Sequence, residues 1–254
     1  MGGADRSERK RNQAASQARL KAAGITPKRS GLSGTPLVLT IVAVVVIAAI
    51  VVGVVVTMKN KAAEAAGPAP NYPVSRAGAV ITAGQAAAPV TVDIYEDYLC
   101  PYCERLESTY KDQITTALNA GQIKVNYHAI SILDNASKPA GYSTRAANAA
   151  ICAADAGIFP AYHAALYADQ PAEGSAGFSV QQLSDKGTAL GAPASFGQCV
   201  AAQGDTNLIE QATNTAAATP ALQSNGQFGT PTVAIGGRKI DVNDSQWLQN
   251  ALKS

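Results

Sequence analysis

The stretch DYLCPYCERL, Asp97 to Leu106, decides the fold prediction because two different hydrophobic patterns meet in it. Before it, PVTVDIYED places Val90, Val92 and Ile94 at alternate positions, which is typical of a strand. After it, apolar side chains recur at steps of three and four, as on one face of a helix: Cys103, Leu106, Tyr110, Ile114 and Ala117. The sequence therefore predicts a strand at 90–96, a helix at 101–120 and a pair of cysteines at their junction.

The position of Cys100 on the first turn of that helix has a chemical consequence. A helix N-terminus presents unpaired N–H groups and the positive end of the helix dipole, and both favour a thiolate. Pro101 suits the first turn because its missing N–H is not needed there. The pattern predicts an exposed Cys100 of low pKa and a shielded Cys103, the arrangement of a disulfide-exchange pair. An inert local disulfide is the alternative.

The other two cysteines, Cys152 and Cys199, lie in Ala-rich stretches that read as short helices. Spacing favours one pair from the CPYC motif and one from these two, which would staple two helices together. A second redox centre, or resolving thiols for the first, is the alternative. Zinc is disfavoured because the second pair is widely spaced and His128 and His163 are the only histidines. We predict no metal, and we find no phosphate loop or nucleotide-binding motif that would indicate a cofactor.

An uncharged apolar segment precedes all four cysteines. Residues 37–58 contain no Asp, Glu, Lys or Arg, and a helix of that length reaches about 33 Å, enough for a bilayer core. Residues 1–59 carry a net charge of +7, and the remainder carries −5. We predict a basic cytoplasmic arm at 1–36, a transmembrane helix at 37–58 and an extracytoplasmic main body, because positive residues stay on the cytoplasmic side.

Two alternatives to this membrane prediction remain open. The apolar segment is longer than a typical signal-peptide core, but the Ala-rich run at 61–67 could still be cleaved. A basic arm can also bind nucleic acid, although this one has no aromatic residues and directly flanks the apolar segment. Residues 59–77, rich in Ala, Pro and charge, read as a linker.

Three elements in order, DYLCPYC, AICAADAGIFPAYHAALYADQ and FGTPTVAIGGRKI, resemble the DsbA-like thiol–disulfide oxidoreductases, most closely the membrane-anchored forms of actinobacteria. The resemblance covers residues 78–254. It implies an α/β fold, a thioredoxin domain with an α-helical insertion at about 137–222. The remaining elements fit this fold: strands near 79–82 and 123–132, a hairpin around Gly236-Gly237, a final helix from Asp244 to Lys253.

The resemblance also assigns site residues. Cys100 matches the family's nucleophile, Cys103 its resolving cysteine, and Pro231 the cis-proline that faces them. A cis bond would place the Thr230 backbone opposite Cys100, where a substrate strand can pair with it.

Two features depart from the best-known family pattern. The buried acid of some relatives is replaced by Ile94, so Glu96 or Asp97 is expected to assist proton transfer from the resolving cysteine; solvated acids at a strand end are the alternative. Tyr102, between Pro101 and the second cysteine, supplies no positive charge to a thiolate, which leaves the direction of electron flow open.

These features lead to one functional expectation with two alternatives. The resemblance implies an extracytoplasmic enzyme that introduces disulfides into exported proteins through Cys100 and Cys103, with a quinone-coupled membrane protein as its reoxidising partner. A reductase or isomerase of the same fold is the first alternative. It ranks lower because isomerase relatives carry a dimerisation domain for which the stretch between Met58 and Gly78 is short. A non-catalytic, membrane-tethered binding module is the second. No nucleic-acid partner is expected, and His163 is expected on a helix surface.

Overall fold

The computed structural model describes residues 68–253. The predicted arm, the predicted transmembrane helix and most of the predicted linker lie outside this range. Within the described range, no helix has the length and apolar character needed to cross a membrane. The predicted linker ends earlier than expected, because its last residues, Val74–Ala77, form a strand that pairs with Val80–Ala83.

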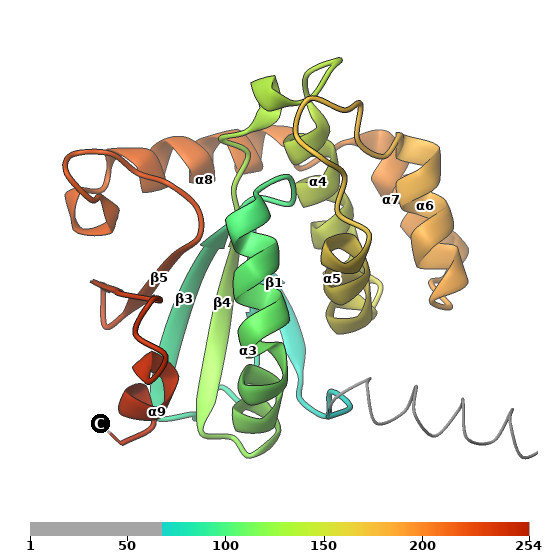
Figure 1. Ribbon diagram of the computed structural model, residues 1–254. Coiled ribbons are helices and arrows are strands. Elements are labelled where there is room, and N and C mark those ends of the chain that lie inside the picture. Colours follow the sequence, from blue (N-terminus) through green and yellow to red (C-terminus); the bar gives the residue numbers. More distant parts are fainter. Residues whose placement is uncertain (1–67, 254) are drawn as a thin grey trace, which may run out of the picture. The chain divides into compact units, whose positions relative to one another are not determined.

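A six-stranded mixed sheet forms the centre of the fold (Figure 1). Its order is β1-β2-β4-β3-β5-β6, and only β3 and β4 run parallel to each other. The strands are β1 Val74–Ala77, β2 Val80–Ala83, β3 Val90–Glu96, β4 Ile123–Ala129, β5 Thr232–Ile235 and β6 Arg238–Ile240. The predicted strands and the hairpin around Gly236-Gly237 are confirmed, except that the strand predicted at 123–132 ends at Ala129. The central strands are buried, with Val92 and Val125 wholly inaccessible to solvent.

Helix α3, Pro101–Asn119, connects the two parallel strands and lies against one face of the sheet (Figure 1). Its buried side chains include every residue of the predicted stripe. The last helix, α9, is shorter than predicted and spans Trp247–Ala251. The difference arises at Asp244, whose carboxylate accepts the N–H of Gln246 at 2.9 Å and so holds a turn where the prediction has the first helical turn.

The helical insertion lies between β4 and β5 and begins three residues before the predicted start. It comprises η1 Asp134–Ala136, α4 Tyr142–Asp155, α5 Phe159–Ala168, α6 Val180–Ala189, α7 Ala194–Ala202, α8 Thr206–Ala218 and η2 Pro220–Leu222. Helix α4 is its core, because all its alanine side chains except that of Ala154 are fully buried and allow neighbouring helices to approach closely. Figure 1 shows α5, α6 and α7 gathered beside α4, with α8 extending across the top.

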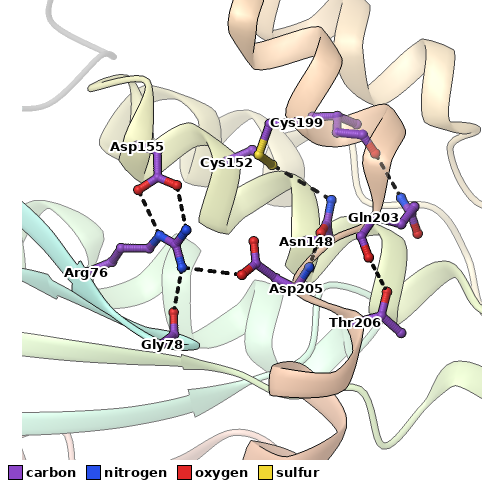
Figure 2. Close-up of a disulfide and its surroundings, with 10 residues drawn as sticks. Arg76, Gly78, Asn148, Cys152, Asp155, Cys199, Gln203, Asp205 and Thr206 are labelled. Atoms are coloured by element: carbon purple, nitrogen blue, oxygen red, sulfur yellow. Dashed lines mark hydrogen bonds and ion pairs between the residues drawn. A yellow bond between two sulfur atoms is a disulfide. The ribbon is translucent and has the colours of Figure 1, made fainter.

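A disulfide joins two helices of this insertion (Figure 2). Cys152 of α4 and Cys199 of α7 are bonded, with their Cα atoms 5.8 Å apart, which confirms the predicted pairing. Asn148, one turn before Cys152, directs its side-chain nitrogen at the Cys152 sulfur (3.8 Å) and accepts the backbone N–H of Asp205 at 3.2 Å. The same amide therefore connects the disulfide to the start of α8.

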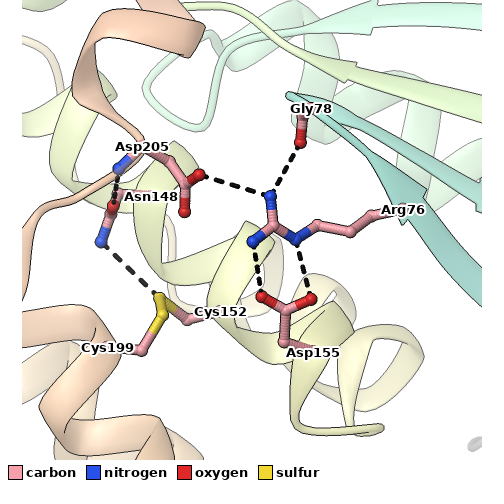
Figure 3. A network of polar contacts seen from close by, with 7 residues as sticks. All are labelled: Arg76, Gly78, Asn148, Cys152, Asp155, Cys199 and Asp205. Atoms are coloured by element: carbon pink, nitrogen blue, oxygen red, sulfur yellow. Dashed lines mark hydrogen bonds and ion pairs between the residues drawn. A yellow bond between two sulfur atoms is a disulfide. The ribbon is translucent and has the colours of Figure 1, made fainter.

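Arg76 ties strand β1 to the insertion (Figure 3). Its guanidinium makes two hydrogen bonds of 2.7 Å to the carboxylate of Asp155, at the end of α4. It also contacts the carboxylate of Asp205 at 3.3 Å and donates to the carbonyl of Gly78 at 3.1 Å. One side chain thus fixes the edge of the sheet against two helices.

Candidate active site

Cys100 and Cys103 lie where β3 gives way to α3. Cys100 is the N-cap of α3, with extended backbone, and Pro101 occupies the first helical position. The expectation of an exposed Cys100 is wrong: its exposed fraction is 4 %, against 2 % for Cys103. The reason is the loop before β5, which brings the carbonyl oxygen of Thr230 to 3.2 Å from the Cys100 sulfur. The prominent side chain at the rim is Tyr102, 67 % exposed.

The pKa values of the two thiols are shifted in opposite directions. The pKa of Cys100 is lowered to about 6, chiefly because the Cys103 thiol donates a hydrogen bond to it, with the N–H groups of Cys103 and Tyr102 adding to the effect. The pKa of Cys103 is raised well above its ordinary value by burial and by the hydrogen bond that its thiol donates to Cys100. At neutral pH the reduced pair is therefore a thiolate beside a thiol, and the thiolate is the nucleophilic form.

The peptide bond between Thr230 and Pro231 is cis, as the resemblance implies. A second cis bond, not expected from the sequence, joins Lys138 and Pro139. A groove extends from the Thr230-Pro231 loop between α3 and the segment that follows β6. It is lined by Tyr102, Arg105, Leu106, Thr109, Tyr110, Thr230, Pro231, Val242 and Asn243.

Asp97 is buried, so for this residue the alternative of a solvated acid at the strand end is wrong. Its carboxylate accepts three hydrogen bonds, from the N–H groups of Leu99 and Leu133 at 2.9 Å each and from the hydroxyl of Ser143 at 2.6 Å. Burial nevertheless raises the pKa of Asp97 to about 6. Its backbone N–H points at the sulfur of Cys103, so this residue contacts the pair directly.

Glu96 is buried as well, and its partner is His163. The carboxylate lies 2.7 Å from Nε2 of the imidazole, and Nδ1 lies 3.5 Å from Glu107 of α3. Burial alone would lower the pKa of His163, but the two carboxylates raise it to about 10. The expectation of a surface histidine is therefore wrong. The missed signal is its spacing, because Phe159 and Tyr167, four residues to either side, are also buried.

Two further polar residues, neither of them expected from the sequence, reach the site from the helical insertion. Ser143 of α4 holds Asp97, as described. Gln170, two residues past the end of α5, donates from Nε2 to the carbonyl of Tyr98 at 3.2 Å and to that of Cys100 at 3.1 Å. These contacts span 46 to 72 residues of sequence, and no local pattern marks them.

Comparison with known proteins agrees with this geometry. Residues 76–254 match the family model described as thioredoxin. The chain belongs to the thioredoxin family. Among proteins of known structure, the MdbA protein of Corynebacterium diphtheriae, a thiol-disulfide oxidoreductase, superposes with a TM-score of 0.62 at 23% identity, over 76% of this chain and 99% of that chain. At this identity the likeness shows the shared fold.

Two mycobacterial proteins have higher identity to this thioredoxin-family chain. The reduced disulfide bond oxidoreductase DsbG of Mycobacterium tuberculosis is 30% identical, with a TM-score of 0.55, over 67% of this chain and 81% of that chain. The serine/threonine-protein kinase PknE of Mycobacterium tuberculosis is 31% identical over 172 residues, 65% of this chain but 30% of the kinase. The chain thus spans about a third of that curated relative. Its fold is that of the DsbA-like thiol–disulfide oxidoreductases.

Proposed function

We propose that the protein is a thiol–disulfide oxidoreductase that introduces disulfides into exported proteins through Cys100 and Cys103. The observation that carries this proposal is the geometry of the pair: Cys100 caps α3 and its sulfur lies 3.2 Å from the Thr230 carbonyl, next to the cis bond to Pro231. The opposite pKa shifts of Cys100 and Cys103 support the same direction of electron flow. A lowered pKa at Cys100 stabilises the reduced form of the enzyme, because the reduced form alone contains the thiolate. A stabilised reduced form makes the disulfide a stronger oxidant. The proposed direction of electron flow is therefore from substrate to enzyme.

The proposed reaction has two exchanges. A substrate thiolate attacks the sulfur of Cys100, a bond forms between them, and the bond between Cys100 and Cys103 breaks with Cys103 leaving and taking up a proton. A second substrate thiolate then attacks the substrate sulfur of this mixed disulfide and releases Cys100 as a thiolate. Two electrons pass to the enzyme, the substrate gains one disulfide, and the proton not held by Cys103 goes to solvent.

The roles of the surrounding residues follow from their positions. Pro231 and the backbone of Thr230 face Cys100 and form one wall of the groove into which an extended substrate would be placed. Tyr102 and Pro101 form the exposed rim at the start of α3. Asp97 contacts Cys103 through its backbone N–H, and its carboxylate, with a pKa of about 6, is the proposed acceptor for the Cys103 proton when that thiol resolves a mixed disulfide. Glu96 and His163 form a buried ion pair, which determines the electric charge close to the two cysteines.

The cellular setting is part of the same proposal. The uncharged segment at 37–58 and the positive charge before it support a membrane anchor with the catalytic domain outside the cytoplasm. The disulfide between Cys152 and Cys199 fits an oxidising compartment and a structural role. The proposed partners are exported proteins with free thiols and a quinone-coupled membrane protein that reoxidises the pair.

The experiment that tests the proposal measures the reduction potential of the Cys100–Cys103 pair in glutathione buffers, with the Cys152→Ala/Cys199→Ala protein as control. A value of about −120 to −180 mV, with rapid oxidation of a reduced test protein, supports an oxidase. A value of about −270 mV contradicts it and indicates a reductase. In Cys103→Ser with glutathione joined to Cys100, a thiolate of the reduced test protein should displace glutathione and stay trapped on Cys100; failure of this exchange would indicate a non-catalytic binding module.

A further inference from the structure

The turn that carries Cys100 is held by a side chain from the helical insertion, that of Gln170. Residues 97–100 form a tight turn in which the N–H of Cys100 donates to the carbonyl of Asp97 at 2.9 Å. The amide nitrogen of Gln170 bridges the carbonyls of Tyr98 and Cys100, the second and fourth residues of this turn. Gln170 belongs to the helical insertion and is 70 residues from Cys100 in sequence.

The carbonyl of Cys100 is also the first acceptor of helix α3. It receives the backbone N–H groups of Cys103 at 3.0 Å and Glu104 at 3.2 Å. The contact from Gln170, at 3.1 Å, is therefore a third donor on the same oxygen. A carbonyl with donors on several sides has little freedom to rotate, and its rotation would turn the peptide plane that connects Cys100 to the helix.

The orientation of this peptide plane bears on the chemistry of Cys100. The N–H groups of Tyr102 and Cys103, which stabilise the thiolate, lie in the first turn of α3 just after that plane. The sulfur must stay within reach of these donors while it also faces the carbonyl of Thr230. Gln170 itself does not touch the sulfur, so its influence is exerted through the backbone.

Gln170 is well placed to hold this position rigidly. Its own backbone N–H donates to the carbonyl of Tyr167 at 3.1 Å, which fixes it to the end of α5. Helix α5 in turn places Tyr162, Leu166 and Tyr167 in the buried core. A carboxamide has the two donor hydrogens that two carbonyls require, whereas a carboxylate has none.

We propose that Gln170 is a positioning residue for the redox reaction: by bridging the carbonyls of Tyr98 and Cys100, it fixes the turn that aims the Cys100 sulfur at the N–H groups of α3. The helical insertion thereby sets the reactivity of a cysteine in the thioredoxin core. This inference deepens the proposed function, but it concerns the thiolate and the potential of the pair, which can be measured without any protein substrate.

The test compares the full chain with Gln170→Met, which keeps the length of the side chain and removes its donors. The rate of iodoacetamide alkylation at Cys100 is measured against pH in the reduced proteins, and the potential in glutathione buffers. We expect the apparent pKa of Cys100 to rise by about half a unit or more and the potential to become more negative. The matched control is Gln181→Met, an exposed glutamine of the same insertion, for which neither quantity should change.

An unchanged pKa and potential in folded Gln170→Met would overturn the proposal, even if its melting temperature fell, because a merely structural contact would lower stability alone. If the methionine variant does not fold, Gln170→Asn, whose amide is one methylene shorter, provides the same comparison. Failure of the proposed function would appear differently: the wild-type protein would not oxidise a reduced test protein, whatever the effect of Gln170 on the alkylation profile.

Discussion

The carboxylate of Glu96 lies 2.7 Å from Nε2 of His163, and both side chains are about 95 % buried. This contact joins the end of strand β3 to helix α5 across 67 residues of sequence. Glu107 of α3 completes the cluster at 3.5 Å from the other imidazole nitrogen. The helix that carries the redox pair, the central strand and the insertion therefore meet at one buried cation between two carboxylates.

Replacement of His163 by Gln should destabilise the protein strongly. It removes the cation and leaves the buried carboxylate of Glu96 and the partly buried one of Glu107 without a charged partner, for which the expected cost is about 3–5 kcal/mol. Urea unfolding measures it. The control is His128→Gln: His128 pairs with Asp93 at 3.0 Å but is partly exposed, so its loss should cost about 1 kcal/mol or less. Equal losses in the two variants would contradict the interpretation.

The contribution of His163 should also depend on pH. Its pKa is raised from 6.5 to about 10 in the folded protein, so the protonated form is favoured by folding. The stability that it adds is fully present below pH 6.5, declines as the pH rises, and is lost above about pH 10. The difference in unfolding free energy between wild type and His163→Gln should follow this course. A difference that grows with pH would exclude a charged His163.

The reduction potential of the Cys100–Cys103 pair should change its pH dependence near pH 6. Below the pKa of Cys100, two protons accompany two electrons, and the potential falls by about 59 mV per pH unit. Above it, Cys100 stays a thiolate and Cys103 takes the single proton, so the slope should halve to about 30 mV per pH unit. A constant steep slope up to pH 8 would mean that Cys100 has an ordinary pKa.

Removal of the second disulfide should lower stability and leave the redox pair unchanged. Cys152 and Cys199 close a loop of 47 residues, for which the chain-entropy model gives about 4 kcal/mol. Urea unfolding of Cys152→Ala/Cys199→Ala measures the loss, and alkylation of Cys100 serves as the second readout. A shifted alkylation profile would show that these cysteines act on the site, as in the alternative of resolving thiols.

Arg76→Lys should loosen strand β1. Lysine cannot reproduce the two parallel bonds to Asp155 together with the contact to Asp205. Because Arg76 and Asp155 are 27 % and 46 % exposed, the stability cost should be about 1 kcal/mol or less. The sharper measurement is amide hydrogen exchange, which should accelerate in β1 and β2. Arg238→Lys, in the opposite edge strand, is the control and should leave that exchange unchanged.

Much of the fold could be predicted because its patterns are local. Alternation in β3, the three-and-four spacing of α3 and the Gly236-Gly237 turn each lie within a few residues of sequence, and each was confirmed. Strand β1 was missed because VSRA is short, only alternately half-buried, and embedded in a Pro- and Ala-rich stretch. Its strand character comes from pairing with β2, and pairing is a tertiary property.

The residues of the candidate site likewise fall into two groups, those in local motifs that could be predicted and those brought in by tertiary packing that could not. The cysteine pair and Pro231 lie in short motifs, so the sequence pointed to them. Gln170 and His163 reach the site only because α5 packs against α3, and nothing in a single sequence records that docking. The burial of Cys100 was missed for the same reason, since the covering Thr230 is 130 residues away.

The 4 % exposure of Cys100 limits the stage of folding at which the cysteines of a substrate protein can reach it. A sulfur so nearly covered is reached only by a narrow, protruding chain that can enter the groove beside Pro231. Cysteines within a completed domain have no such reach, whereas those in a newly emerged, still extended polypeptide do. If the protein acts as proposed, the recessed position of Cys100 would restrict it to substrate cysteines that are still accessible because their domain has not yet folded.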